Sequence, residues 1–158
     1  MHGKSVLAAV DGSVRAAAVY AAAREWEGAF GATVHLFRAV ALPPEIPAAA
    51  SNLADGTAAI VQRNIMVELQ RLASDAGNVK IEPAIISAAA PWRLILDAAA
   101  RLDAALIVIG SHGFGGWDHL LGTTASQVCN RADRNVLVVH HRSEVRTDST
   151  NVLGERPA

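Results

Sequence analysis

Five short apolar segments, separated by longer stretches with a helical repeat, constrain the fold of this chain more than any other feature of its sequence. The segments lack the alternation of apolar and polar residues that a strand with one solvated face shows, so we expect both faces of each strand to be buried. Such strands form a mainly parallel sheet with helices on each side, and right-handed crossovers give a doubly wound arrangement. The sequence therefore predicts a single α/β domain.

The expected elements alternate strictly between strand and helix. The five strands are expected at Ser5–Val10, Thr33–Arg38, Val79–Ser87, Ala105–Ile109 and Val136–Val139. The four helices are expected between Ser13 as cap and Gly31 as closing residue, over Val61–Ala76, over Pro91–Leu102 and over Thr123–Ala132. Outside them we expect a loop at Pro43–Gly56, a domain that spans residues 1–141, and a flexible polar tail at residues 142–158.

Composition and charge exclude several classes of protein. Hydrophobic residues make up 51% of the 158 residues and the formal net charge is −1, which rules out a disordered chain and gives no general attraction for nucleic acid. No apolar stretch approaches the roughly 20 residues that cross a bilayer. The single cysteine, Cys129, allows no intramolecular disulfide and fits a reducing compartment. We therefore expect a cytoplasmic protein with neither nucleic acid nor membrane as a partner.

Two of the predicted strand ends carry residues suited to a ligand. In a doubly wound sheet, ligands bind beyond the carboxyl ends of the strands. Asp11 follows the first strand, and a glycine-rich stretch at Gly110–Gly116 follows the fourth, before Gly122 opens the next helix. Glycines let main-chain amides approach a ligand closely, and the first amides of a helix favour an anion. The sequence thus predicts a phosphate-binding site at these strand ends.

The same residues also have ordinary structural uses. Glycines after a strand make tight turns, and Asp11 could bond its own turn or cap the following helix. No lysine stands where a P-loop requires it, and the first strand does not lead into a dinucleotide GxGxxG motif, so both of those readings are disfavoured. Because Lys4 and Lys80 are the only lysines, a phosphate site built around a lysine has almost no candidates.

Three separated segments resemble the universal stress protein family, in the same order and over roughly residues 4–140. They are the opening Val6–Ser13, the Gly110-x2-Gly113 motif that precedes Gly122-Thr123, and the closing Asn135–Val139. ATP-binding members of that family have the pattern Gly-x2-Gly-x9-Gly-(Ser/Thr). In this chain the second spacer, Phe114 to Leu121, is one residue shorter.

The resemblance implies an adenine nucleotide alpha hydrolase-like fold with strand order 3-2-1-4-5, and a homodimer through the last strand, Val136 to Val139. It also implies an adenine nucleotide, ATP or else ADP or AMP, together with Mg²⁺. Carried over residue by residue, Asp11 would bind a ribose hydroxyl or Mg²⁺, and Ala39 would pack against adenine. The other implied contacts are Ala9, Val10, Ile109 and Gly110 along the nucleotide, and Gly113, Gly122, Thr123 and Thr124 at the phosphates.

Three functional hypotheses follow from these residues. The leading one is a dimeric stress-response protein that binds ATP as a regulatory ligand and is not an enzyme. The second is a slow ATPase or phosphotransferase, for which Asp11 and His112 are the nearby candidate groups. The third is a nucleotide-independent dimeric interaction protein whose pocket is vestigial because the glycine loop is short. No cluster of residues has the spacing of a zinc site, and Cys129 is expected in the core.

Overall fold

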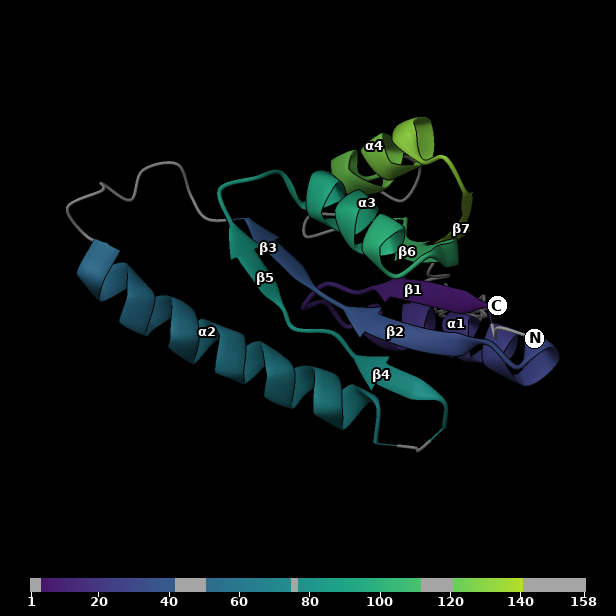
Figure 1. Ribbon diagram of the computed structural model, residues 1–158, viewed down its shortest axis with the longest axis horizontal. Coiled ribbons are helices and arrows are strands. Elements are labelled where there is room, and N and C mark those ends of the chain that lie inside the picture. Colours follow the sequence, from purple (N-terminus) through teal and green to yellow (C-terminus); the bar gives the residue numbers. More distant parts are fainter. Residues whose placement is uncertain (1–3, 42–50, 75–76, 112–120, 141–158) are drawn as a thin grey trace, which may run out of the picture.

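The computed structural model describes residues 4–41, 51–74, 77–111 and 121–140 (Figure 1). The described part contains four helices, in the number expected, and seven strands. In chain order they are β1 (Ser5–Ala9), α1 (Ala16–Phe30), β2 (Thr33–Phe37), β3 (Ala39–Ala41), α2 (Ser51–Leu72), β4 (Val79–Ile81), β5 (Ile85–Ser87), α3 (Pro91–Arg101), β6 (Ala104–Gly110), α4 (Thr123–Arg131) and β7 (Asn135–Val139). The glycine loop with His112 and Gly113, and the tail at residues 142–158, lie outside the described residues.

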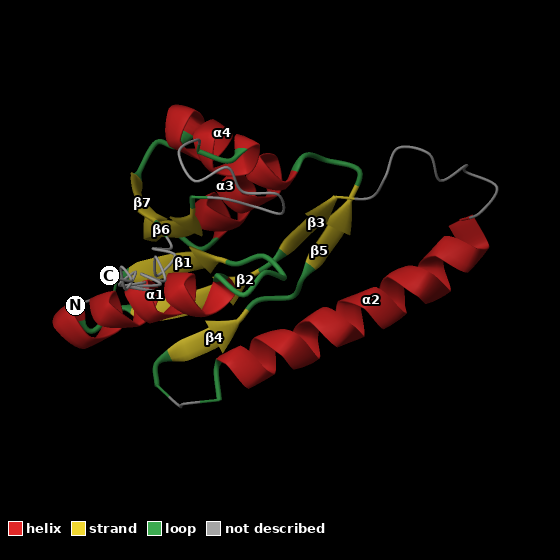
Figure 2. Cartoon of the chain, turned by 180° about the vertical axis from the view of Figure 1, so that it is seen from behind, coloured by secondary structure: helices red, strands yellow, loops and turns green. Residues whose placement is uncertain are grey.

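The main sheet has five parallel strands in the order β4-β2-β1-β6-β7. Numbered by the five predicted strands, this is the order 3-2-1-4-5, so the expected topology is confirmed. Helices α1 and α2 lie on one side of the sheet and α3 and α4 on the other, as Figures 1 and 2 show from opposite sides. The doubly wound prediction is therefore confirmed as well.

Side chains of the central strand β1 enter both halves of the core. Val6 and Ala8 belong to the apolar cluster beneath α1 and α2, whereas Leu7 and Ala9 belong to the cluster beneath α3 and α4. All four are almost fully buried. Removing apolar surface from water on both faces is the main favourable contribution to folding here, and it explains why the strand sequences show no polar alternation.

The prediction of one strand over Val79–Ser87 is wrong, because the segment forms two strands that belong to different sheets. β4 pairs with β2, whereas β5 pairs with β3 in a separate two-stranded parallel sheet. The amide of Glu82 donates to the Leu36 carbonyl at 2.9 Å, and pairing resumes where the Ile85 amide donates to Arg38 at 3.2 Å. Between them stands Pro83, which has no N–H to contribute.

The expectation of a loop throughout Pro43–Gly56 is also wrong, because α2 begins at Ser51, ten residues before the expected Val61. The first half of this helix extends past the main sheet (Figure 1). Ile60 is 63% exposed, whereas Ile65 and Leu69 are buried. The buried stripe therefore marks only the second half of the helix, and the periodicity of the sequence gave no sign of the first.

Gly31 and Pro91 stand at the helix ends where the sequence placed them, whereas Ser13 does not. Gly31 closes α1 in the left-handed conformation with φ 62°, and Pro91 begins α3. Ser13 does not cap α1: the N-cap is Arg15, whose amide donates to Ser13 Oγ at 3.2 Å before the helix starts. The expected burial of Cys129 is also wrong, since it is exposed on α4.

Among the described helices, none is both long and apolar enough to pass through a membrane.

Candidate nucleotide-binding site

The carboxyl ends of β1 and β6 lie side by side. Ala9 on β1 pairs with Ile109 on β6, and both side chains are buried in the core beneath α3 and α4. Val10 and Gly110 follow directly, and the amide of Val10 donates to the Phe37 carbonyl of β2 at 3.0 Å. The structure thus brings together the four residues that the sequence predicts to line a nucleotide.

Helix α4 begins with main-chain donors that its own turns do not use. Its N-cap, Gly122, is extended with φ −57° and ψ 151°, and no side chain among the described residues caps the helix. The first amides of a helix have no acceptor within it, and the described part of the chain supplies none for Thr123 or Thr124. The Gly122 amide differs, because it donates to the Ser111 carbonyl at 2.6 Å. Of the three predicted phosphate contacts here, two retain their donors.

Asp11 is fixed by the turn that follows β1. Its Oδ1 accepts hydrogen bonds from the Ser13 amide at 3.0 Å and from the Ser13 hydroxyl at 2.5 Å. This is the Asx turn that the sequence left open as an alternative to ligand binding. The two uses are compatible, because Asp11 is only partly buried and Oδ2 makes no hydrogen bond within the described residues.

Ala39, the predicted adenine contact, directly follows the second strand expected at Thr33–Arg38, but it is not the end of β2. It is the first residue of β3, pairs with Ile85 in the second sheet, and packs against the core beneath α3 and α4. Since Ala9 belongs to the same apolar cluster, Ala39 is still on the same side of the molecule as the other predicted nucleoside contacts.

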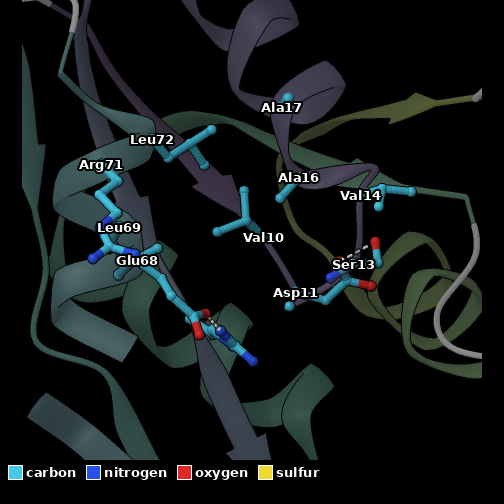
Figure 3. A pocket seen from close by; sticks show the side chains of 12 residues that line it. Val10, Asp11, Ser13, Val14, Ala16, Ala17, Glu68, Leu69, Arg71 and Leu72 are labelled. Atoms are coloured by element: carbon cyan, nitrogen blue, oxygen red, sulfur yellow. Dashed lines mark hydrogen bonds and ion pairs between the residues drawn. The ribbon is translucent and has the colours of Figure 1, made fainter. Parts of the chain in front are cut away.

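A cavity of about 380 Å³ opens at the carboxyl ends of β1 and β2, between the start of α1 and the second half of α2 (Figure 3). Asp11 and Val10 reach it from β1. Charged residues from elsewhere complete it, and the sequence reading missed them. The lining residues are Val10, Asp11, Gly12, Ser13, Val14, Ala16, Ala17, Arg38, Glu68, Leu69, Arg71 and Leu72.

Arg38 is the main functional candidate that sequence reasoning missed. Its Nη1 lies 2.5 Å from Glu68 Oε2 on α2, and its guanidinium packs so closely over Gly12 that a Cβ there would overlap Nη2. One available signal was its position, since a cation that directly follows an apolar strand stands at the ligand-binding edge of such a sheet. Glu68 gave no signal, because it lies 30 residues away on an ordinary helix.

Taken together, the sheet order and the helix start beyond β6 define a doubly wound α/β domain, a class in which ligands bind where the strand order reverses, here between β1 and β6. The chain belongs to the universal stress protein family, whose model matches residues 3–140. The suspected resemblance is therefore confirmed over nearly all of the described chain. No curated protein matches the sequence.

Solved structures support the same fold. Hypothetical protein MJ0577 has 22% identity and a TM-score of 0.72, with 90% of this chain and 99% of that chain covered. Universal stress protein UspA from Lactobacillus plantarum has 27% identity and a TM-score of 0.68, with 89% and 99% covered. A universal stress protein in complex with cAMP has 21% identity and a TM-score of 0.60, with 87% and 96% covered.

Proposed function

We propose that this chain binds an adenine nucleotide in the crevice between β1 and β6, as a regulatory ligand in a stress-response role. The observation that carries the proposal is the uncapped start of α4 at Thr123, beyond the strand that pairs with β1. Main-chain amides at a helix start favour a phosphate without any lysine. The cAMP complex of a universal stress protein with the same fold supports an adenine nucleotide.

ATP with Mg²⁺ is the form we propose for the ligand. No group of three or more potential metal-ligating side chains occurs among the residues that the structure describes, so these residues alone offer little to a metal. Mg²⁺ commonly takes one or two carboxylates and completes its shell with phosphate oxygens and water. Asp11, with Oδ2 available, fits that role, and the bound ion would neutralise phosphate charge.

The proposed assembly is a homodimer through β7, an edge strand of the main sheet. The carbonyl of Val139 accepts from Ser111 at 2.9 Å, on the side that faces β6. Because the main-chain groups of successive residues face opposite sides of a strand, those of Val136 and Val138 face away from β6. They form an edge suited to pair with a second copy.

A second candidate function, nucleotide-independent interaction, has one observation in its favour. The Gly122 amide and Asp11 Oδ1, both expected to meet the nucleotide, are bonded within the chain itself. We rank it below nucleotide binding, because Thr123, Thr124 and the second oxygen of Asp11 retain their hydrogen-bonding capacity. Slow ATP hydrolysis ranks lower still, since Asp11 is held in its turn; the other candidate group, His112, lies outside the described residues.

Calorimetric titration tests the proposal directly. We expect Mg-ATP to bind with one site per chain, and ADP, AMP and cAMP to show which phosphates matter. A complex that stays intact without release of ADP separates regulatory binding from hydrolysis. If none of the four nucleotides gives heat or a thermal shift, the crevice does not bind nucleotide and the interaction hypothesis takes its place. Light scattering at micromolar concentration tests the dimer, which a monomeric mass would refute.

A further inference from the structure

We infer that the cavity between α1 and α2 is a second binding site, for a small organic acid that joins one carboxylate or phosphate group to an apolar body. The cavity is on the opposite side of the sheet from most of the nucleotide crevice. Ala9 and Ile109 belong to the core cluster that α3 and α4 cover. Val10 and Leu69 belong to the other cluster, which α1 and α2 form with the sheet. Of the predicted nucleotide contacts, only Val10 and Asp11 also line the cavity.

The anion-binding group is Arg38, whose situation is unusual for a charged side chain. Its side chain is 18% exposed, whereas that of its partner Glu68 is 58% exposed. Charges that leave water usually need a well-fixed partner, yet an ion pair with an exposed, flexible carboxylate contributes little stability. Arg38 itself is fixed against the backbone at Gly12. An anionic ligand could therefore replace Glu68 on Arg38 at small cost.

The rest of the cavity suits an apolar body. Val10 and Leu69 are buried in its wall, and Figure 3 shows Leu69 and Leu72 of α2 across from Val10 at the end of β1. A volume of about 380 Å³ falls within the range of small-molecule sites, about 300–1,000 Å³. Arg71 adds a second cation to the lining, and no ion pair of Arg71 occurs within the described part of the chain.

Two substitutions in the same ion pair give opposite expected results. Calorimetry on the full chain uses phenyl phosphate and benzoate as probes, with benzyl alcohol and inorganic phosphate as controls that lack the charge or the ring. Arg38→Gln should lower the affinity for the charged aromatic probes at least tenfold. Glu68→Gln should raise it severalfold, because the internal competitor for Arg38 is removed. Arg63→Gln, which changes an exposed α2 residue outside the cavity lining, should leave it unchanged.

The opposite signs distinguish binding from a structural role. Both substitutions break one ion pair, so thermal unfolding should shift slightly in the same direction for both. If the probes lose affinity in both variants, the ion pair only maintains the shape of the cavity and the inference is overturned. It is equally overturned if neither charged probe binds the unaltered protein more tightly than benzyl alcohol does. The preferred probe tells whether the natural ligand is a carboxylate or a phosphate ester.

Saturation with Mg-ATP tests whether the two sites are separate. We expect the affinity for the preferred probe to be the same with and without the nucleotide, and the same in Thr123→Pro, a change confined to the α4 start. If ATP displaces the probe, the cavity is part of the nucleotide crevice and there is no second site. If ATP does not bind at all while the probe does, the nucleotide proposal fails and the second site remains.

Discussion

The two halves of the sheet present different chemistry at their shared carboxyl edge. In the half formed by β6, α4 and β7, the groups available to a ligand or partner are main-chain ones, at Thr123, Thr124 and the outer side of β7. In the half formed by β2 and α2, they are side chains, Arg38 and Glu68 above all. Main-chain donors follow from local geometry, whereas a charged cavity requires segments distant in sequence to meet. Side-chain changes should therefore act mainly in one half and amide deletions in the other.

The largest expected effect is on stability, in the half that depends on side chains. Ile65→Ala should lower the free energy of unfolding by about 2–5 kcal/mol, because it leaves a cavity where a 4%-exposed side chain joins α2 to the sheet. Ile60→Ala, on the same helix but 63% exposed, is the matched control and should change stability by less than about 0.5 kcal/mol. Urea unfolding measures both, and equal losses would show that the first half of α2 is also packed.

The next effect concerns the proposed dimer and depends on a single main-chain N–H in each copy. Val138→Pro removes a donor on the outer side of β7, so the dimer dissociation constant should rise about 100-fold, since each change counts twice in a symmetric dimer. Leu137→Pro removes a donor that faces β6 and should instead cost about 1–3 kcal/mol of folding stability. Sedimentation and thermal unfolding separate the two. A dimer undisturbed by Val138→Pro would mean that the copies meet elsewhere.

Thr123→Pro tests the amides of α4. Proline is well accepted at the first position of a helix, as Pro91 shows in α3, and the extended Gly122 suits a following proline. The change should weaken nucleotide binding about tenfold or more, the usual value of a hydrogen bond to a charged group, with little loss of stability. Thr123→Ala keeps the amide and should lose less. If both variants lose the same amount of nucleotide affinity, the hydroxyl and not the amide makes the contact. If neither variant loses affinity, Thr123 does not contact the nucleotide.

The smallest effect is expected for the contact between Asp133 and Arg134. It is a side-chain contact in the half formed by β6, α4 and β7, where the groups available to a ligand are main-chain ones. The side-chain hydrogen bond and the charge of Arg134 lower the pKa of Asp133 from its ordinary value of 3.8. Because the pKa is lower in the folded state, the ionised Asp133 side chain stabilises the fold at pH values above 3.8. This stabilisation is lost as the pH falls through the folded-state pKa. Because Asp133 is exposed, Asp133→Asn should change the melting temperature only slightly at pH 7, and this change should shrink as the pH falls below 3.8. A large change in melting temperature at pH 7 would contradict the expectation that side-chain changes act mainly in the half formed by β2 and α2.

Most residues of the proposed nucleotide site could be named from the sequence, whereas most residues of the cavity beside α2 could not. The ends of β1 and β6 could be predicted because each apolar run is interrupted in the sequence itself, by Asp11 after β1 and by Gly110 at the end of β6. The break at Pro83 also had a local signal, a missing N–H, yet the isoleucines around it suggested one continuous strand. The early start of α2 had none, because the apolar positions that predicted this helix begin only at Val61.

What the sequence determined by itself was the layered architecture, because strands that are apolar on both faces can be buried only in a sheet covered on both sides. It also determined where a main-chain anion site could form. The tertiary structure alone decided that Arg38 meets Glu68 over Gly12, that Asp11 uses one oxygen for its own turn, and that the Gly122 amide is taken by Ser111. Each depends on the positions of groups in space, which the chain sets only after its segments have packed.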